Sequence, residues 1–139
     1  MTTLLFALSL SARDHSAMNG AWTLMPAKSD FAGQPALLSG AVTIEDRQGN
    51  ITVTRSFVYD DAAIAVFYSD VTDSRHNATI RTGKDLKSKT KWDRDVLKVT
   101  STQSGAITLE SYTLTADGAM TVSVARPEHK PLTLVFERK

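Results

Sequence analysis

The stretch Gly20-Ala21-Trp22 decides the fold together with Arg138, near the far end of the chain. The sequence between these two points has the pattern of β-strands. When such strands close into a barrel, the first and the last become neighbours, and an arginine there can lie over a tryptophan ring as a cation–π pair. We therefore predict that Gly20, Trp22 and Arg138 have a structural role and close a barrel.

Alternation of apolar and polar residues with a period of two dominates from Gly20 onward, and a helical stripe is absent. The segments that carry this alternation are predicted strands: 21–25, 41–45, 51–59, 63–68, 78–82, 88–92, 96–102, 107–115, 120–126 and 132–138. Residues suited to tight turns, such as Ser104-Gly105 and Asp117-Gly118, separate them. Short turns between consecutive strands favour an antiparallel meander.

A meander of this kind must hide its two edge strands, and closure into a barrel removes both edges. We predict an all-β, antiparallel up-and-down β-barrel of about 8–10 strands, preceded by a short N-terminal helix or leader. A β-sandwich is the competing architecture.

Length and composition limit the function classes. The chain has 139 residues, and we expect a single barrel domain over residues 18–139. Its net charge is +1, from 16 basic and 15 acidic residues, which disfavours binding to nucleic acid. It has no cysteine, and its three histidines are scattered without metal-ligand spacing. The sequence therefore predicts no metal, no cofactor and no thiol chemistry.

Residues 1–17 form an apolar N-terminal segment. The apolar run at 4–10, followed by small residues up to Ala12, is typical of the core of a secretory signal peptide, although a basic start is missing and the residue three positions before a cut after Ala12 is large. Two interpretations stay open: a leader that exports the protein to the periplasm or the medium, or a short helix over one mouth of the barrel in a cytoplasmic protein, capped by Asp14 or Ser16. The run is too short to span a membrane, so stable membrane insertion is not expected.

Longer motifs extend the opening pattern: Gly20-x-Trp22-x-Leu24 with Lys28-Ser29-x-Phe31, Lys91-Trp92-Asp93-x-Asp95-x-Leu97, Glu110-Ser111-Tyr112-x-Leu114-x-x-Asp117-Gly118, and Val135-Phe136-Glu137-Arg138. The Gly-x-Trp with its distant arginine resembles the sparse signature of the calycins, the lipocalins, fatty-acid-binding proteins and their relatives. The whole set resembles a poorly characterised group of bacterial lipocalin-like proteins, many of them exported. The resemblance spans nearly all of residues 18–139 and implies a barrel without an agreed ligand or reaction. The Arg-x-Tyr that clamps a carboxylate in fatty-acid-binding proteins is missing from the last strand.

Side-chain alternation indicates which residues face the inside, although a slip of one residue would exchange the two faces. The candidate ligand-binding residues are those that we expect on inner faces: Arg55, Phe57, Tyr59, Tyr68, Leu109, Val122, Val124 and Arg126. A small barrel either fills its interior with side chains or holds one small ligand.

Arg55 and Arg126 each interrupt an apolar face, where an unpaired charge would be costly. Each is either an anchor for a carboxylate-bearing ligand, or a structural residue that lies at a strand end or pairs with an acid such as Glu110. Arg126 precedes Pro127, which favours a strand end.

Catalysis has little support, because the motifs of hydrolases, phosphate-binding loops and zinc proteases are absent. The leading hypothesis is a non-catalytic barrel that binds a small apolar or amphipathic ligand in its interior. The alternative is a ligand-free envelope or protein-interaction module. A small barrel enzyme, such as an isomerase or cyclase, would need Arg55, Tyr68 and His76 to converge on one pocket.

Overall fold

The structure is a computed structural model that describes residues 15–34, 36–47, 50–59, 70–73, 78–81, 86–103 and 105–139. Its main element is an eight-stranded antiparallel sheet in the order β3-β2-β1-β10-β9-β8-β7-β6. The strands of this sheet are β1 (Gly20–Leu24), β2 (Leu37–Arg47), β3 (Asn50–Tyr59), β6 (Leu86–Asp93), β7 (Val96–Gln103), β8 (Ala106–Leu114), β9 (Met120–Ala125) and β10 (Leu132–Arg138).

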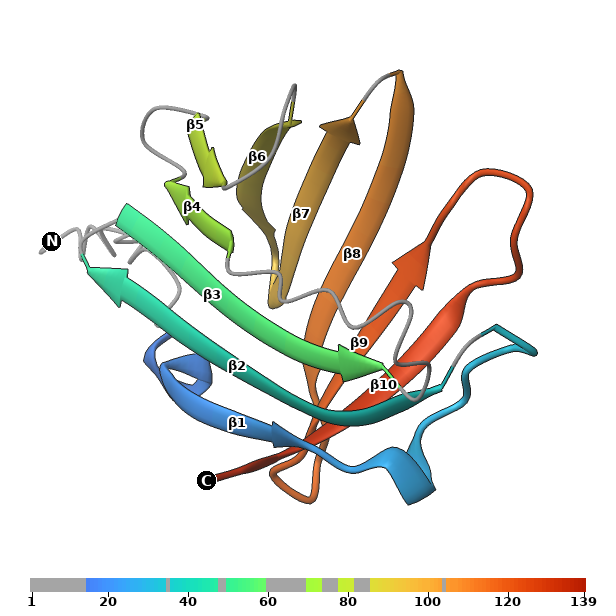
Figure 1. Cartoon of the computed structure of the whole chain (residues 1–139). Helices are drawn as coiled ribbons and strands as arrows, with labels where there is room; N and C mark the ends of the chain where they lie inside the picture. Colours follow the sequence, from blue (N-terminus) through green and yellow to red (C-terminus); the bar gives the residue numbers. More distant parts are fainter. Residues whose placement is uncertain are drawn as a thin grey trace, which may run out of the picture.

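The sheet curls into a nearly closed barrel, with β3 and β6 at its two edges (Figure 1). A separate two-stranded ladder of β4 (Asp70–Asp73) and β5 (Ala78–Arg81) lies between these edges, with β4 against β3 and both short strands against β6. The predicted all-β, antiparallel, up-and-down barrel is confirmed. The described residues contain no α-helix, only the 3-10 turns η1 (Ser16–Met18) and η2 (Pro26–Lys28).

Most predicted strands coincide with observed ones to within a few residues. The largest difference is in β2, which begins at Leu37 and not at residue 41 as predicted. Its first residues pair with β3 through a register shift between Leu37 and Ser39, and apolar and polar residues do not alternate regularly across such an irregularity. The strand β4 was not predicted, because Asp70-Val71-Thr72-Asp73 lacks apolar alternation. The strand expected at 63–68 falls outside the described residues.

The first and last strands pair as the opening motif predicted. In the antiparallel ladder of β1 and β10, Trp22 lies opposite Arg138. The Arg138 guanidinium carbon lies 4.3 Å from the centroid of the Trp22 ring, and its Nη atoms donate hydrogen bonds to the carbonyls of Ala17 and Asn19. Gly20 is required beside them, because its φ is +123° and a Cβ there would lie 3.0 Å from Nη1 of Arg138.

We call the end of the barrel at which β1 begins and β10 ends the closed end. The turn η1 covers it, with Met18 buried and its carbonyl accepting a hydrogen bond of 2.9 Å from Trp22 Nε1. The apolar run at 4–10, which was expected to be either a leader or a helix over one mouth of the barrel, lies outside the described residues, and the described part of this segment forms a single 3-10 turn. The expected cap Ser16 is wrong, since the residue before the turn is His15 and no side chain caps it, while Asp14 lies outside the described residues.

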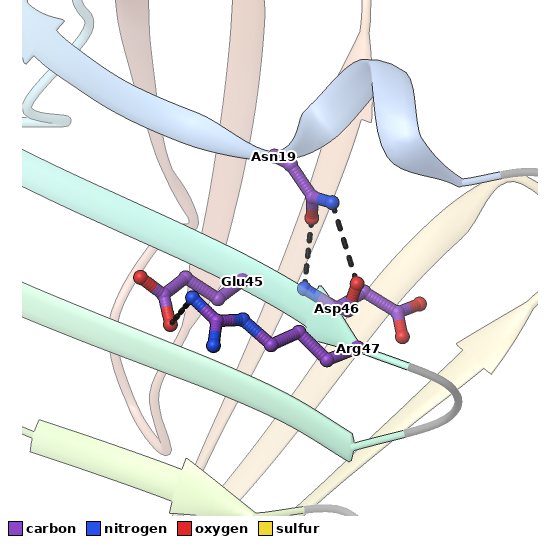
Figure 2. A network of polar contacts seen from close by, with 4 residues as sticks. All are labelled: Asn19, Glu45, Asp46 and Arg47. Carbon is purple, nitrogen blue, oxygen red and sulfur yellow. Dashed lines mark hydrogen bonds and ion pairs between the residues drawn. The ribbon is translucent and has the colours of Figure 1, made fainter.

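The Asn19 side chain extends the sheet past the start of β1 (Figure 2). Its Oδ1 accepts a hydrogen bond of 2.8 Å from the backbone N–H of Asp46, and its Nδ2 donates to the Asp46 carbonyl at 3.4 Å. The amide thus occupies the place of one more backbone pair between β1 and β2. Arg47 turns back along β2 to pair with Glu45 at 3.8 Å on the exposed side of the sheet.

A second set of contacts ties η1 to the hairpin of β6 and β7. The His15 ring stacks on Trp92 with centroids 3.7 Å apart and planes 4° from parallel, and His15 Nε2 donates to the Arg94 carbonyl at 2.8 Å. Trp92 Nε1 in turn donates to Asp46 Oδ2 at 3.0 Å, which links β6 to β2 across the closed end. Trp92 therefore covers the closed end of the barrel.

Candidate ligand-binding site

The inner face of the barrel carries a polar cluster near its middle, which we call the Arg55 cluster (Arg55, Glu110 and Tyr112). Alternation along β3 turns Arg55 inward, and alternation along β8 turns Glu110 inward. The two residues are therefore only 4% and 7% exposed. Arg55 Nη1 and Glu110 Oε1 form an ion pair. They are the only charged residues among the buried ones that the structure describes.

Tyr112 completes the cluster from the next inward position of β8. Its hydroxyl donates a hydrogen bond of 2.6 Å to Glu110 Oε2 and accepts one of 3.5 Å from Arg55 Nη1. Burial, together with the adjacent Glu110 carboxylate, raises the pKa of Tyr112 above its usual value, so the phenol stays protonated. Burial disfavours the charged form of Arg55, but Glu110 and Tyr112 outweigh it and raise the pKa of that guanidinium. Both oxygens of Glu110 are therefore engaged.

Two buried hydroxyls lie on the same wall of the barrel. Thr90 on β6 is 3% exposed and Ser101 on β7 is 5% exposed, and within the described part of the chain neither hydroxyl oxygen has a hydrogen-bond partner. The ladders place Thr90 opposite Val99, and Val99 opposite Glu110, so Thr90 belongs to the same row as Glu110. Ser101 is a diagonal neighbour of Glu110, about 7–8 Å away for such positions.

Apolar side chains surround this polar patch. Toward the closed end, the row next to Glu110 consists of Leu97, Tyr112, Val122 and Leu134, joined by successive strand pairs. On the other side of Glu110 along its own row, Val124 and Leu132 continue the apolar wall. The inner wall therefore consists of apolar side chains around one compact group of hydrogen-bonding atoms.

The structure brings together four of the predicted site residues on the inner face. Arg55, Val122 and Val124 are buried, and Phe57 is partly buried against the core, its ring 6.5 Å from that of Phe136. Of the two roles weighed for Arg55, pairing with Glu110 is the one observed.

Two predicted inner residues lie elsewhere. Leu109 is 50% exposed on the outer face of β8, because that strand has the register opposite to the predicted one. Arg126 is exposed just after β9 ends, so it does not point into the barrel. Tyr59 ends β3, but its side chain is outside what the structure describes, and so are Tyr68 and His76. The convergence that an enzyme would need therefore stays a prediction.

The predicted ligand-binding residues did not include Glu110, Tyr112, Thr90 or Ser101, although Glu110 was named as a possible ion-pair partner of Arg55 or Arg126. For β8 the strand pairing could have indicated the inner face. The hairpin of β7 and β8 pairs Gln103 with Ala106, and counting residue pairs outward from this one places Glu110 opposite the apolar Val99. Thr90 and Ser101 offered no such signal, since threonine and serine are equally common on outer faces.

A pocket of about 300 Å³ opens at the closed end, between η1 and the ends of β6 and β8. Its lining residues include Leu114 and three residues that take part in closing the barrel: His15, Met18 and Trp92. No group of three or more potential metal ligands occurs in the ranges that the structure describes. Nor does any helix there have the length and apolarity to cross a membrane.

Comparison with known proteins identifies the fold. No family model matches the chain, and no curated protein matches it in sequence. Solved structures do match. Two single-substitution variants of the fluorescent protein UnaG have TM-scores of 0.60 and 0.58 at 14% and 15% identity, covering 89% and 88% of this chain and 97% and 96% of theirs.

The fatty-acid-binding protein of Manduca sexta matches with a TM-score of 0.55 at 12% identity, covering 88% of this chain and 99% of that protein. Such identities show a shared fold alone. The chain therefore has the same barrel fold as these proteins, with its first and last strands paired as the Gly-x-Trp and Arg138 motif indicated.

Proposed function

We propose that this protein binds a small apolar or amphipathic molecule in the interior of its barrel. The observation that carries the proposal is the Arg55 cluster together with the unpartnered hydroxyls of Thr90 and Ser101, set in an otherwise apolar inner wall. One of the proteins with the same fold is, by its name, a fatty-acid-binding protein.

The energetics support a role beyond stability. A buried ion pair is often no more stabilising than apolar side chains of the same volume, because both charges lose their hydration. A buried hydroxyl without a partner costs about 1–3 kcal/mol. An interior kept polar at this cost suits a ligand that has a polar end and an apolar body.

The experiment is a titration of the whole chain with Nile red, a neutral dye that fluoresces in apolar surroundings, together with native mass spectrometry of the gently purified protein. We expect saturable dye uptake at one site and a bound small molecule that is lost on denaturation. A wild-type protein that takes up no dye and carries no adduct would contradict the proposal and favour a filled barrel that acts through its surface.

Two variants locate the binding. Val124→Phe enlarges a side chain on the inner wall, whereas Ser123→Phe makes a similar enlargement at the exposed neighbouring position of β9. We expect Val124→Phe to weaken dye binding by about tenfold or more and Ser123→Phe to leave it unchanged. Equal affinity of the two variants for Nile red would indicate that the dye binds on the outside of the barrel. Circular dichroism checks whether both variants are folded. If Val124→Phe does not fold, the proposal is decided by whether the wild-type protein carries a bound small molecule in native mass spectrometry.

A further inference from the structure

We propose that the polar end of the ligand is an uncharged hydroxyl or carbonyl group and not a carboxylate. This inference rests on the proposed function and specifies the class of molecule that the same site accepts. It comes from the charge balance of the Arg55 cluster and from the chemistry of the two hydroxyls beside it.

The positive charge of Arg55 is already matched. Its partner Glu110 lies inside the barrel with it, and the Tyr112 phenol that bridges them is neutral. Among the residues whose side chains the structure describes, no other charged residue is buried. A ligand carboxylate would therefore bring a second negative charge next to Glu110, where it would lose its hydration without gaining a further buried cation from the described side chains.

Among the described residues, the buried side-chain atoms that make no hydrogen bond include Nε of Arg55, whose charge Glu110 matches, and two hydroxyl oxygens. The hydroxyls are of a different kind, because they carry no charge. Thr90 Oγ1 and Ser101 Oγ can each donate one hydrogen bond and accept others, and neither has a partner among the described residues. An alcohol can pair with both as donor and acceptor, and a carbonyl can accept from both. These groups need no counter-charge, so they fit a cluster whose formal charge is zero.

The test compares dodecanol with dodecanoate, which share an apolar chain, as competitors of Nile red at about pH 8, where the acid is ionised. Because an alcohol enters any apolar site more easily than an anion, the decisive quantity is the ratio of the two affinities in two variants. Glu110→Gln leaves the Arg55 charge unmatched inside the barrel. Glu137→Gln makes the same chemical change on the exposed face of β10.

We expect wild-type protein and Glu137→Gln to prefer dodecanol, and Glu110→Gln to shift the ratio toward dodecanoate by about tenfold or more. An unchanged ratio in Glu110→Gln, or wild-type protein that binds dodecanoate as tightly as dodecanol, would overturn the inference while leaving the binding function intact. If Nile red binds and neither competitor displaces it, the inference is also wrong. If Nile red itself does not bind, the proposed function fails.

A second measurement needs no variant, in case Glu110→Gln does not fold. Dodecanoic acid loses its proton at about pH 4–5, as a glutamate side chain does. We expect its affinity for the wild-type protein to fall as the pH rises through that range, while the affinity for dodecanol stays constant. Dodecanoate binding that persists undiminished above about pH 6 would contradict the inference.

Discussion

Arg55 and Glu110 form an ion pair although four strands, β2, β1, β10 and β9, separate their strands along the sheet. Neighbouring strands lie about 4.8 Å apart, so in a flat sheet the two side chains could not meet. They meet because the sheet curls until the inner faces of β3 and β8 oppose each other (Figure 1). The pair is thus a contact through the interior of the barrel.

Removing one member of this pair leaves the other charged and buried. We expect Arg55→Met and Glu110→Leu each to lower the free energy of unfolding by about 3–5 kcal/mol, and the double variant to regain much of that loss. Urea unfolding of the four proteins measures the coupling.

The exposed pair of Lys98 and Asp93, 3.0 Å apart, is the control for that cycle. Its alanine cycle should show a much smaller coupling, because water screens both groups. Additive losses at Arg55 and Glu110 would contradict the assigned ion pair.

Arg138 fastens the last strand of the barrel, β10, to the first strand, β1. We expect Arg138→Ala to lower the free energy of unfolding by about 1–3 kcal/mol, because the stack on Trp22 and the hydrogen bonds to Ala17 and Asn19 are lost together. Thermal unfolding followed by circular dichroism checks this. Arg126→Ala, at an exposed arginine beyond β9, should change stability by less than about 0.5 kcal/mol, and a similar loss in both variants would rule out a special role of Arg138.

Gly40 on β2 leaves room for Phe57. A Cβ at this position would lie 2.8 Å from Phe57 Cδ1 and 3.2 Å from Leu24 Cβ. We expect Gly40→Ala to destabilise the barrel by about 1–3 kcal/mol through overpacking. Ala41→Ser, at the exposed neighbouring position, should be nearly neutral, and chemical denaturation of both variants distinguishes a packing effect from a general sensitivity of β2.

Tyr112 makes stability depend on alkaline pH. Its pKa is raised in the folded protein, while the unfolded chain releases the same proton at about pH 10. Its contribution is therefore fully present below about pH 10 and falls as the pH rises further, by up to about 1.4 kcal/mol per pH unit.

Tyr112→Phe isolates this effect from the other groups that titrate in the same range. We expect the variant to be less stable by about 1–3 kcal/mol at neutral pH, because the bond to Glu110 is lost, and the gap to narrow above about pH 10. Urea unfolding from about pH 8 to about pH 11 measures it, and a constant gap would show that Tyr112 ionises normally.

The fold was predictable where a single physical requirement acts on a few residues. Closing a barrel requires the first and last strands to pair, and Trp22 and Arg138 mark that pair in the sequence. Strand β3 was also placed correctly, because Ile51 and Val53 fix the face that Arg55 shares.

The site was less predictable, because it lies where the inner face is not apolar. On β8, Ile107 and Leu109 looked like the inner residues, yet both are about half exposed and Glu110 and Tyr112 point inward. Hydrophobic alternation fails for a wall that carries polar side chains, whereas counting from the hairpin turn succeeds because register depends on backbone pairing.

The pairing of β1 with β10 also has a consequence for synthesis on the ribosome. Until Arg138 has been made and has emerged, β1 has only β2 beside it, and Trp22 lacks the cation that covers its ring. Contacts between residues so far apart in sequence form slowly, because a long loop must first be closed. The nascent chain therefore exposes the edge of β1 until β10 has emerged, and this is the stage at which chaperones would protect it best from pairing with other chains.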